Sequence, residues 1–229
     1  MVAPVYPSIP HLPGSRCAED RTVPPGVARR CVDPGGAVAG AEVIVQEKLD
    51  GSCVAVARRD GELVALGREG RPCAESGNEA RRWFAAWVAS ERARFEPLVR
   101  EGEVLAGEWL ALVHGTRYAL DHEPFVPFDL FVDRKRVPVD VLTARLAGAG
   151  LEMPRVVHRG APIAIADAVA KLGRGLHGAI DPPEGLVYRV ELRFDVLHVA
   201  KWVRPSKVDG SLLPENSGAP ALYHWRPPP

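Results

Sequence analysis

The sequence predicts an α+β fold made of antiparallel β-sheets flanked by helices. Two alternating apolar runs, over residues 42–59 and 62–68, are joined by Asp60-Gly61, the strongest short-range signal for a β-hairpin. Residues 78–95 have the spacing of an amphipathic helix, and two further strand-like runs follow at 184–192 and 196–204. Strands that alternate with helices in the order β, α, β, α, β are typical of an α+β domain.

Composition describes an ordinary globular protein without a global field for nucleic acid. The 229 residues carry 29 Lys+Arg and 29 Asp+Glu, so the formal net charge is zero. Because 46% of the residues are hydrophobic, a chain of this length can form the core of one large domain or of two small ones. Any nucleic-acid binding must therefore come from a local patch.

Cysteine usage and apolar runs predict a cytoplasmic location. Four cysteines lie in the first third of the chain and none has C-x-x-C spacing, which argues against a zinc site or a disulfide framework. No apolar run approaches the ~20 residues that span a bilayer. The first residues lack the charged and apolar regions of a signal peptide, so we expect reduced thiols in the cytosol and no membrane partner.

From the N-terminus, the sequence first predicts an arm and then a hairpin. Residues 1–40 are rich in Pro and Gly and predict an extended, loop-like arm. A two-residue hairpin loop at Asp60-Gly61 places Arg68 opposite Cys53, which brings Arg68 close to Lys48.

The remaining elements follow in order. The Trp83/Phe84/Trp87 stripe of the helix over 78–95 is expected to be core rather than a stacking platform. Residues 103–115 are predicted to form a strand, or a strand and a turn, and residues 124–133 another strand. Helices are expected over 138–150 and 162–173, ending at Gly150 and Gly173, and residues 206–229 as an irregular tail.

The stretch "EKLDGS" places Lys48 where a strand should be burying itself. A buried ammonium is costly, so the segment is either a plain exposed turn or a site that uses the lysine nitrogen. Other polar positions have equally plain readings when taken singly: Glu108 at a strand edge, Glu184 in a turn, and Lys201 as a snorkelling lysine.

Taken in order along the chain, these positions resemble the covalent nucleotidyltransferase superfamily of polynucleotide ligases and capping enzymes. The matching positions are Lys48-Leu49-Asp50-Gly51 (K-x-D-G), Arg68, Glu108 in "AGEWLA", Phe128-Asp129, Glu184-Gly185-x-Val187-x-Arg189, and Lys201. Within the superfamily the chain is most similar to the RNA ligases of the second phage type and the RNA-editing ligases. The resemblance implies that residues 1–229 form a single ATP-grasp-like nucleotidyltransferase domain.

The resemblance also implies a reaction and a role for each position. Lys48 would attack the α-phosphate of ATP, expel pyrophosphate and hold AMP, which then passes to a 5′-phosphate before a 3′-hydroxyl displaces it. The substrates would be RNA ends or a nicked duplex, with Mg²⁺ or Mn²⁺ as cofactor. The implied roles are adenine contact by Glu47 and Phe128, ribose contact by Glu108, phosphate neutralisation by Arg68 and Lys201, metal binding by Glu184, and later joining steps by Asp129.

A lysine nucleophile must be uncharged when it attacks. We therefore expect a lowered pKa for Lys48, with Arg68, Lys201 and a bound divalent metal as the cations that destabilise its ammonium.

The chain departs from the family pattern at several positions. The lysine usually found two residues before Lys201 is Val199, unless Lys207 or Arg204 substitutes for it, and Cys53 stands where an Asn is common. The segment after Lys201 is too short for an OB-fold or a helical C-terminal domain, so the expectation is either weak binding of nucleic acid strands or a partner protein that supplies the missing grip. His11, Arg16 and Arg134-Lys135-Arg136 are candidates to help, although a solvated loop is the plainer reading of the basic segment.

Two rivals stay open. A DNA ligase or a GTP-using capping enzyme would keep the chemistry and change the acceptor, against which Glu47 and the missing OB-fold count. A non-catalytic nucleotide- or nucleic-acid-binding domain with decayed motifs is the other, favoured by Val199 and opposed by the intact Lys48, Glu108 and Glu184.

Overall fold

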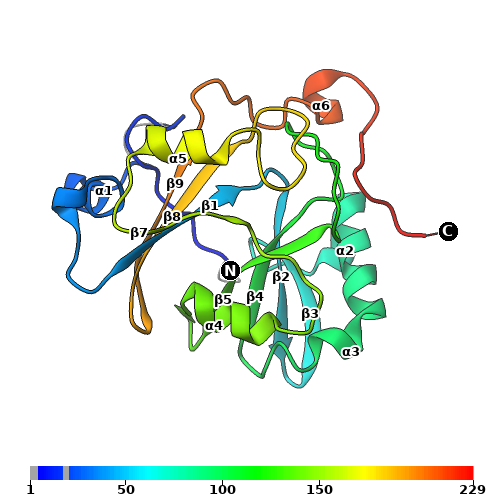
Figure 1. The fold of residues 1–229 in the computed structure, drawn as a ribbon. Helices are drawn as coiled ribbons and strands as arrows, with labels where there is room; N and C mark the ends of the chain where they lie inside the picture. The colour runs from blue at the N-terminus through cyan, green and yellow to red at the C-terminus, as the bar shows by residue number, and fades with distance from the viewer. Residues whose placement is uncertain (1–4, 18–20, 229) are drawn as a thin grey trace.

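Two antiparallel sheets form the framework of the computed structural model, which describes residues 5–17 and 21–228 (Figure 1). The four-stranded sheet has the order β7-β1-β8-β9, from Val156–Gly160, Glu42–Lys48, Gly185–Leu192 and Asp195–Val203. The five-stranded sheet has the order β3-β2-β4-β5-β6, from Glu62–Gly67, Ser52–Arg59, Val104–Trp109, Phe125–Val132 and Lys135–Arg136. The α+β prediction with antiparallel sheets is confirmed.

The chain passes from one sheet to the other through the three residues between β1 and β2. This short crossing lies against the end of β4, and a Cβ added to Gly51 would come within 2.6 Å of the Trp109 carbonyl oxygen. Because backbone cannot yield at that distance, only glycine fits there. The crossing leaves Lys48 at the joint between the sheets.

The hairpin of β2 and β3 has the predicted register. Arg59 pairs with Glu62 and Val54 with Gly67, on either side of a turn in which Asp60 and Gly61 both have positive φ. Two consecutive positive φ values are the requirement of the type I′ turn that Asp-Gly favours.

Helices cover the outer faces of the sheets. The 78–95 pattern is α2 (Glu79–Ser90), capped by the Asn78 side chain, and α3 (Arg92–Phe95), with an interruption at Glu91. Phe84 and Trp87 are buried against Trp109, as the core reading of the aromatic stripe predicts. These contacts fix α2 on the five-stranded sheet (Figure 1).

Later elements differ from the predictions mainly at their ends. Helix α4 (Val139–Leu146) stops before Gly150, whereas α5 (Ile165–Leu172) ends at Gly173, whose φ is +59°. Strand β7 was not assigned from the sequence, and the expected irregular tail contains one short helix, α6 (Pro214–Ser217).

The expected loop-like arm over residues 1–40 is wrong for its second half. Helix α1 (Pro25–Val32) begins with Pro25, whose fixed φ suits a first helical position, and it buries Cys31 completely. The 3₁₀ turns Pro34–Gly36 and Cys73–Glu75 are the remaining short elements. The parts of the arm at 1–4 and 18–20 lie outside the described residues.

The first half of the arm crosses between the two sheets, and we call residues 6–12 the N-terminal strap. At one end the Tyr6 N–H donates to the Arg68 carbonyl beside β3. At the other, the Leu12 N–H donates to the Lys201 carbonyl (2.7 Å) and the Lys201 N–H to the Pro10 carbonyl (3.0 Å) on β9. The strap therefore connects the two sheets by backbone hydrogen bonds.

Within residues 5–17 and 21–228, no helix combines the length and apolar character that crossing a bilayer requires. All four cysteines are free thiols.

Candidate active site

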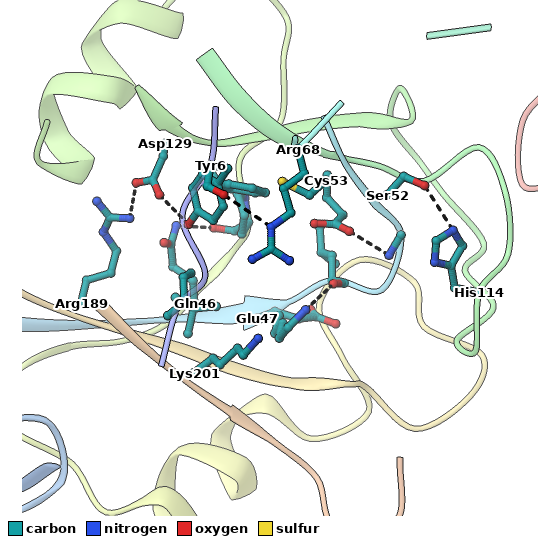
Figure 2. Close-up of a pocket in the computed structure, with 18 of the residues that line it drawn as sticks. Tyr6, Gln46, Glu47, Ser52, Cys53, Arg68, His114, Asp129, Arg189 and Lys201 are labelled. Atoms are coloured by element: carbon teal, nitrogen blue, oxygen red, sulfur yellow. Dashed lines mark hydrogen bonds and ion pairs between the residues drawn. The ribbon is translucent and has the colours of Figure 1, made fainter. Parts of the chain in front are cut away.

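A cavity of about 340 Å³ opens where the two sheets meet (Figure 2). All but one of the residues that the sequence predicts as site residues line it, and the exception, Glu184, is ion-paired to a residue that does. The lining residues among them are Glu47, Lys48, Arg68, Glu108, Phe128, Asp129 and Lys201. Segments more than 150 residues apart in sequence thus share one cavity.

Lys48 is the last residue of β1 and lies opposite Gly185, the first residue of β8. This register brings Glu184, which precedes β8, beside the lysine. The Lys48 Nζ donates to Glu184 Oε2 at 2.8 Å and to the Leu49 carbonyl at 3.3 Å. The plain exposed-turn reading of Lys48 is wrong, because only 21% of its side chain is exposed.

The expected lowering of the Lys48 pKa does not hold in the ligand-free pocket. Burial by itself lowers the pKa, but the carboxylates of Glu184, Glu108 and Asp50 outweigh it, so the pKa of Lys48 is raised. Lys48 is therefore held as an ammonium ion by its carboxylate neighbours.

Glu108 faces the same cavity from β4, where it pairs with Cys53 of β2. Its Oε1 accepts the Gly51 N–H at 3.0 Å, which ties it to the crossing beside the nucleophile. Burial raises the pKa of Glu108 to about 7, although the Lys48 ammonium lowers it in part.

Arg68 follows β3 and reaches the pocket, as the hairpin register predicts. In Figure 2 its guanidinium points from the five-stranded sheet toward the strand that carries Glu47. Its Nε donates to the Tyr6 carbonyl at 3.4 Å, so the strap rests on it.

Phe128 and Asp129 are consecutive, yet both border the cavity. Ala106 pairs with Asp129 and Gly107 with Pro127, so the ladder between β4 and β5 skips Phe128. This bulge changes the alternation of side chains and turns Phe128 toward the pocket. The Tyr6 ring supports it edge-on, with the ring centroids 5.0 Å apart.

Asp129 is almost fully buried and both of its oxygens are engaged. Oδ1 accepts from Arg189 at 2.6 Å, and Oδ2 accepts from the Tyr6 hydroxyl at 2.8 Å and from Arg136 Nε at 3.0 Å. Arg136 is therefore not part of a solvated loop, which corrects that reading of the basic segment. Asp129 links both sheets and the strap at the edge of the cavity.

Glu47 presents one satisfied and one free carboxylate oxygen. Its Oε2 accepts the Leu176 N–H at 2.5 Å, whereas its buried Oε1 has no hydrogen-bond partner among the described residues. Burial raises the pKa of Glu47, partly offset by the backbone N–H donors. An acceptor held in this way suits an amino group of a ligand.

Lys201 lies on β9 opposite Val187 and lines the pocket beside Lys48. Its pKa is lowered by burial and by the charge of Lys48, although Glu184 opposes the shift. Val199, at the position where a lysine is common, pairs with Arg189 instead.

Comparison with known proteins identifies the family. A family model described as RNA ligase matches residues 41–203, well over half of the chain. This chain belongs to the RNA ligase family. A search of curated proteins finds no match.

Solved structures of RNA ligases share the fold. Naegleria gruberi RNA ligase with pyrophosphate has a TM-score of 0.53 at 22% identity, with 72% of this chain and 50% of that chain covered. A variant of that ligase with ATP and manganese gives 0.54 at 20% identity, covering 87% and 60%. An archaeal ATP-dependent RNA ligase gives 0.51 at 20% identity, covering 86% and 48%. The chain spans about half the length of the solved ligases it matches.

In this RNA ligase family member, the sequence did not predict the contacts of several residues near the site. Lys207 is only 1% exposed and its Nζ contacts Asp50 Oδ2, so it does not substitute at the phosphates as one reading allowed. The Tyr118 hydroxyl accepts the Asp50 N–H at 3.0 Å, and His114 contacts Ser52. Only Lys207 had a signal, as a lysine shortly after the last motif.

The negative charge of the buried carboxylates suits a divalent cation. Glu184, Glu108 and Asp50 surround Lys48, and burial raises the pKa of both Glu184 and Glu108, so added positive charge would be favourable. The described residues contain no cluster of three or more metal-ligating side chains. Mg²⁺ commonly takes one or two carboxylates and completes its shell with substrate phosphates and water.

Proposed function

We propose that this chain is an ATP-dependent RNA ligase that forms a lysyl-AMP intermediate, with residues 1–229 acting as one nucleotidyltransferase domain. The observation that carries the proposal is the Lys48 amine, which lies in a cavity with six of the other predicted site residues and is ion-paired to the seventh, Glu184. The family model supports the same reading.

In the first step the Lys48 nitrogen would form a bond to the α-phosphorus of ATP and pyrophosphate would leave. The amine must lose its proton and its pairing with Glu184 before it attacks. A divalent cation at Glu184 would neutralise that carboxylate and the charge of the transferring phosphate. Lys201 and Arg68, from the two different sheets, would supply positive charge to the same cavity.

The nucleotide would be oriented by residues already in place. The free Oε1 of Glu47 would accept from the adenine amino group, and Phe128 would stack on the ring. Glu108, near neutral pH a partly protonated carboxyl, would bind the ribose hydroxyls. Because Glu47 is an acceptor and adenine offers it an amino group, this contact would favour ATP over GTP.

In the later steps AMP would pass to the 5′-phosphate of an RNA strand, and a 3′-hydroxyl would displace it to join the ends. Asp129 would support these steps through the contacts that join both sheets to the strap.

A labelling experiment tests the proposal. The protein is incubated with α-labelled ATP or GTP and Mn²⁺ and run on a denaturing gel, with Lys48→Ala as the test variant. Lys171→Ala, a change at an exposed lysine on α5, is the matched control. Label from ATP alone that disappears only in Lys48→Ala is expected; label from GTP alone indicates capping chemistry, and no label indicates a binding domain.

Nicked duplexes of RNA and of DNA then identify the acceptor. Sealing of RNA but not DNA is the expected result. We also propose that a partner protein strengthens strand binding, and sealing by the purified chain alone at nanomolar nick concentrations would contradict that part.

We infer a role in RNA repair in the cytoplasm. The four free thiols support a reducing compartment. Fractionation of cells and survival after RNA-damaging stress, with and without the Lys48→Ala variant, test these two points.

A further inference from the structure

A second cavity adjoins the one that holds Lys48. Its volume is about 890 Å³, and it is formed by the segment after β3 and the entry to α2. Arg68 and Arg81 line both cavities, so these two side chains form the wall between them. A group bound in the second cavity would lie directly beside the nucleophile's cavity.

Three arginines that line the second cavity have no carboxylate partner among the described residues. None of the ion pairs within residues 5–17 and 21–228 includes Arg68, Arg71 or Arg81. The contrast is with arginines such as Arg145, which is paired to Glu103. These three guanidinium groups therefore have no ion-pair partner within the described part of the chain.

Arg81 shows that this charge is not merely a solvated face. Its Nε is buried and lacks any hydrogen-bond partner among the described residues. A buried donor without an acceptor is costly, so the site is complete only with an external acceptor. Glu69 and Glu75 also border the cavity and are exposed, as Arg71 is, but the three guanidinium groups outnumber these two carboxylates.

We propose that the second cavity binds a phosphate group, held by Arg71 and Arg81 with Arg68 at the shared wall. A guanidinium presents its N–H donors in a planar fork that matches phosphate oxygens. Under the proposed ligase function, on which the choice of ligand rests, the phosphate belongs either to the pyrophosphate end of ATP or to the 5′-terminal phosphate of the RNA strand.

Binding measurements on the intact chain test the site without requiring ligation. Arg81→Met and Arg71→Met remove one guanidinium each and keep an unbranched apolar stem. Arg59→Met is the matched control, because Arg59 is an exposed arginine at the last position of β2. The probes are inorganic pyrophosphate and two nicked RNA duplexes that differ only in a 5′-phosphate or a 5′-hydroxyl, and thermal melting checks that each variant folds.

The expected result is a loss of about 10-fold or more in affinity for one phosphate probe in both test variants, with Arg59→Met unchanged. A loss confined to pyrophosphate assigns the ATP end; a lost preference for 5′-phosphate over 5′-hydroxyl RNA assigns the strand. Unchanged binding of both probes by folded Arg71→Met overturns the proposal. Failure of the ligase function would show instead as missing lysyl-AMP while the phosphate affinities stand.

Discussion

Lys207 contributes a buried positive charge beside Asp50, two residues after Lys48. Its ammonium contacts Asp50, and the two side chains are 1% and 9% exposed. Asp50 is in the same short crossing as Lys48, so Lys207 balances one of the three carboxylates that hold the Lys48 proton. The pair lies 157 residues apart in sequence.

Replacing Lys207 by Met is expected to lower the free energy of unfolding by about 3–5 kcal/mol, because it leaves the Asp50 charge buried and unpaired. The double variant Asp50→Asn/Lys207→Met should recover at least half of that loss. Urea unfolding measures both. Equal loss in the single and double variants would show that the loss does not come from an unpaired Asp50 charge.

His177 and His122 form a chain of hydrogen bonds that fixes both rings as neutral. The Arg155 N–H donates to His177 Nε2 (3.0 Å), so His177 carries its hydrogen on Nδ1 and donates to His122 Nε2 (2.8 Å). His122 must then donate from Nδ1 to the Glu123 carbonyl (2.7 Å). Burial, aided by the charge of Arg155, lowers the pKa of His177 to about 4.

The lowered pKa makes stability depend on pH. Between its unfolded value near 6.5 and about 4, the unfolded chain binds more protons at His177 than the folded one, so stability falls as pH drops. We expect His177 to account for about 2 kcal/mol of loss in unfolding free energy between pH 7 and pH 5. His177→Gln should flatten the slope in urea unfolding, and His158→Gln, a surface change, should not.

At the scale of elements, the bulge in β5 decides which side chains reach the pocket. A regular ladder would send Phe128 and Asp129 to opposite faces. Pro127 cannot donate a ladder hydrogen bond, which is consistent with an interruption at this point.

Phe128→Ala is expected to raise the KM for ATP in lysyl-AMP formation by about 10- to 100-fold, because stacking of a base on an aromatic ring contributes about 1–3 kcal/mol. The kcat should change little. Phe194→Ala, at a phenylalanine that is 84% exposed, is the control. A fall in kcat with KM unchanged would remove Phe128 from nucleotide binding.

How far the sequence predicted each element depended on whether the signal was local. The β2–β3 hairpin and its register followed from Asp60-Gly61, and the end of α5 from Gly173. Helix α1 was missed because Pro24, Pro25 and Gly26 read as loop, and only tertiary packing shows that Cys31 is buried. Strand β7 is a half-exposed edge strand without clear alternation.

The candidate site was predictable in its membership but not in its electrostatics. Lys48, Glu108 and Glu184 were found from motif order, whereas the raised pKa of Lys48 depends on three carboxylates whose distances no sequence states. The contact of Lys207 with Asp50 likewise requires the folded tail.

At the scale of the whole molecule, the strap and Asp129 hold the two sheets around the cavity. Tyr6 takes part in both, since its N–H bonds to the Arg68 carbonyl and its hydroxyl donates to Asp129. Arg189, from the other sheet, bonds to the same carboxylate. The two sheets are thus held around the cavity by the strap and by the contact between Asp129 and Arg189.

Tyr6→Phe is expected to cost about 1–3 kcal/mol of unfolding free energy, because a buried carboxylate loses a donor. Tyr223→Phe, which removes an exposed hydroxyl bonded to Glu79, should cost less than about 0.5 kcal/mol. Chemical unfolding of the two variants makes the comparison; similar small losses in both would mean that the Tyr6 hydroxyl does not join the sheets.

The strap also sets a timing for biosynthesis. Residues 6–12 are translated long before Lys201, whose backbone receives them. Until then Leu12, completely buried in the finished protein, lacks the part of its packing surface that β8 and β9 supply. A nascent chain on the ribosome therefore cannot complete the cavity around Lys48 until translation has passed β9.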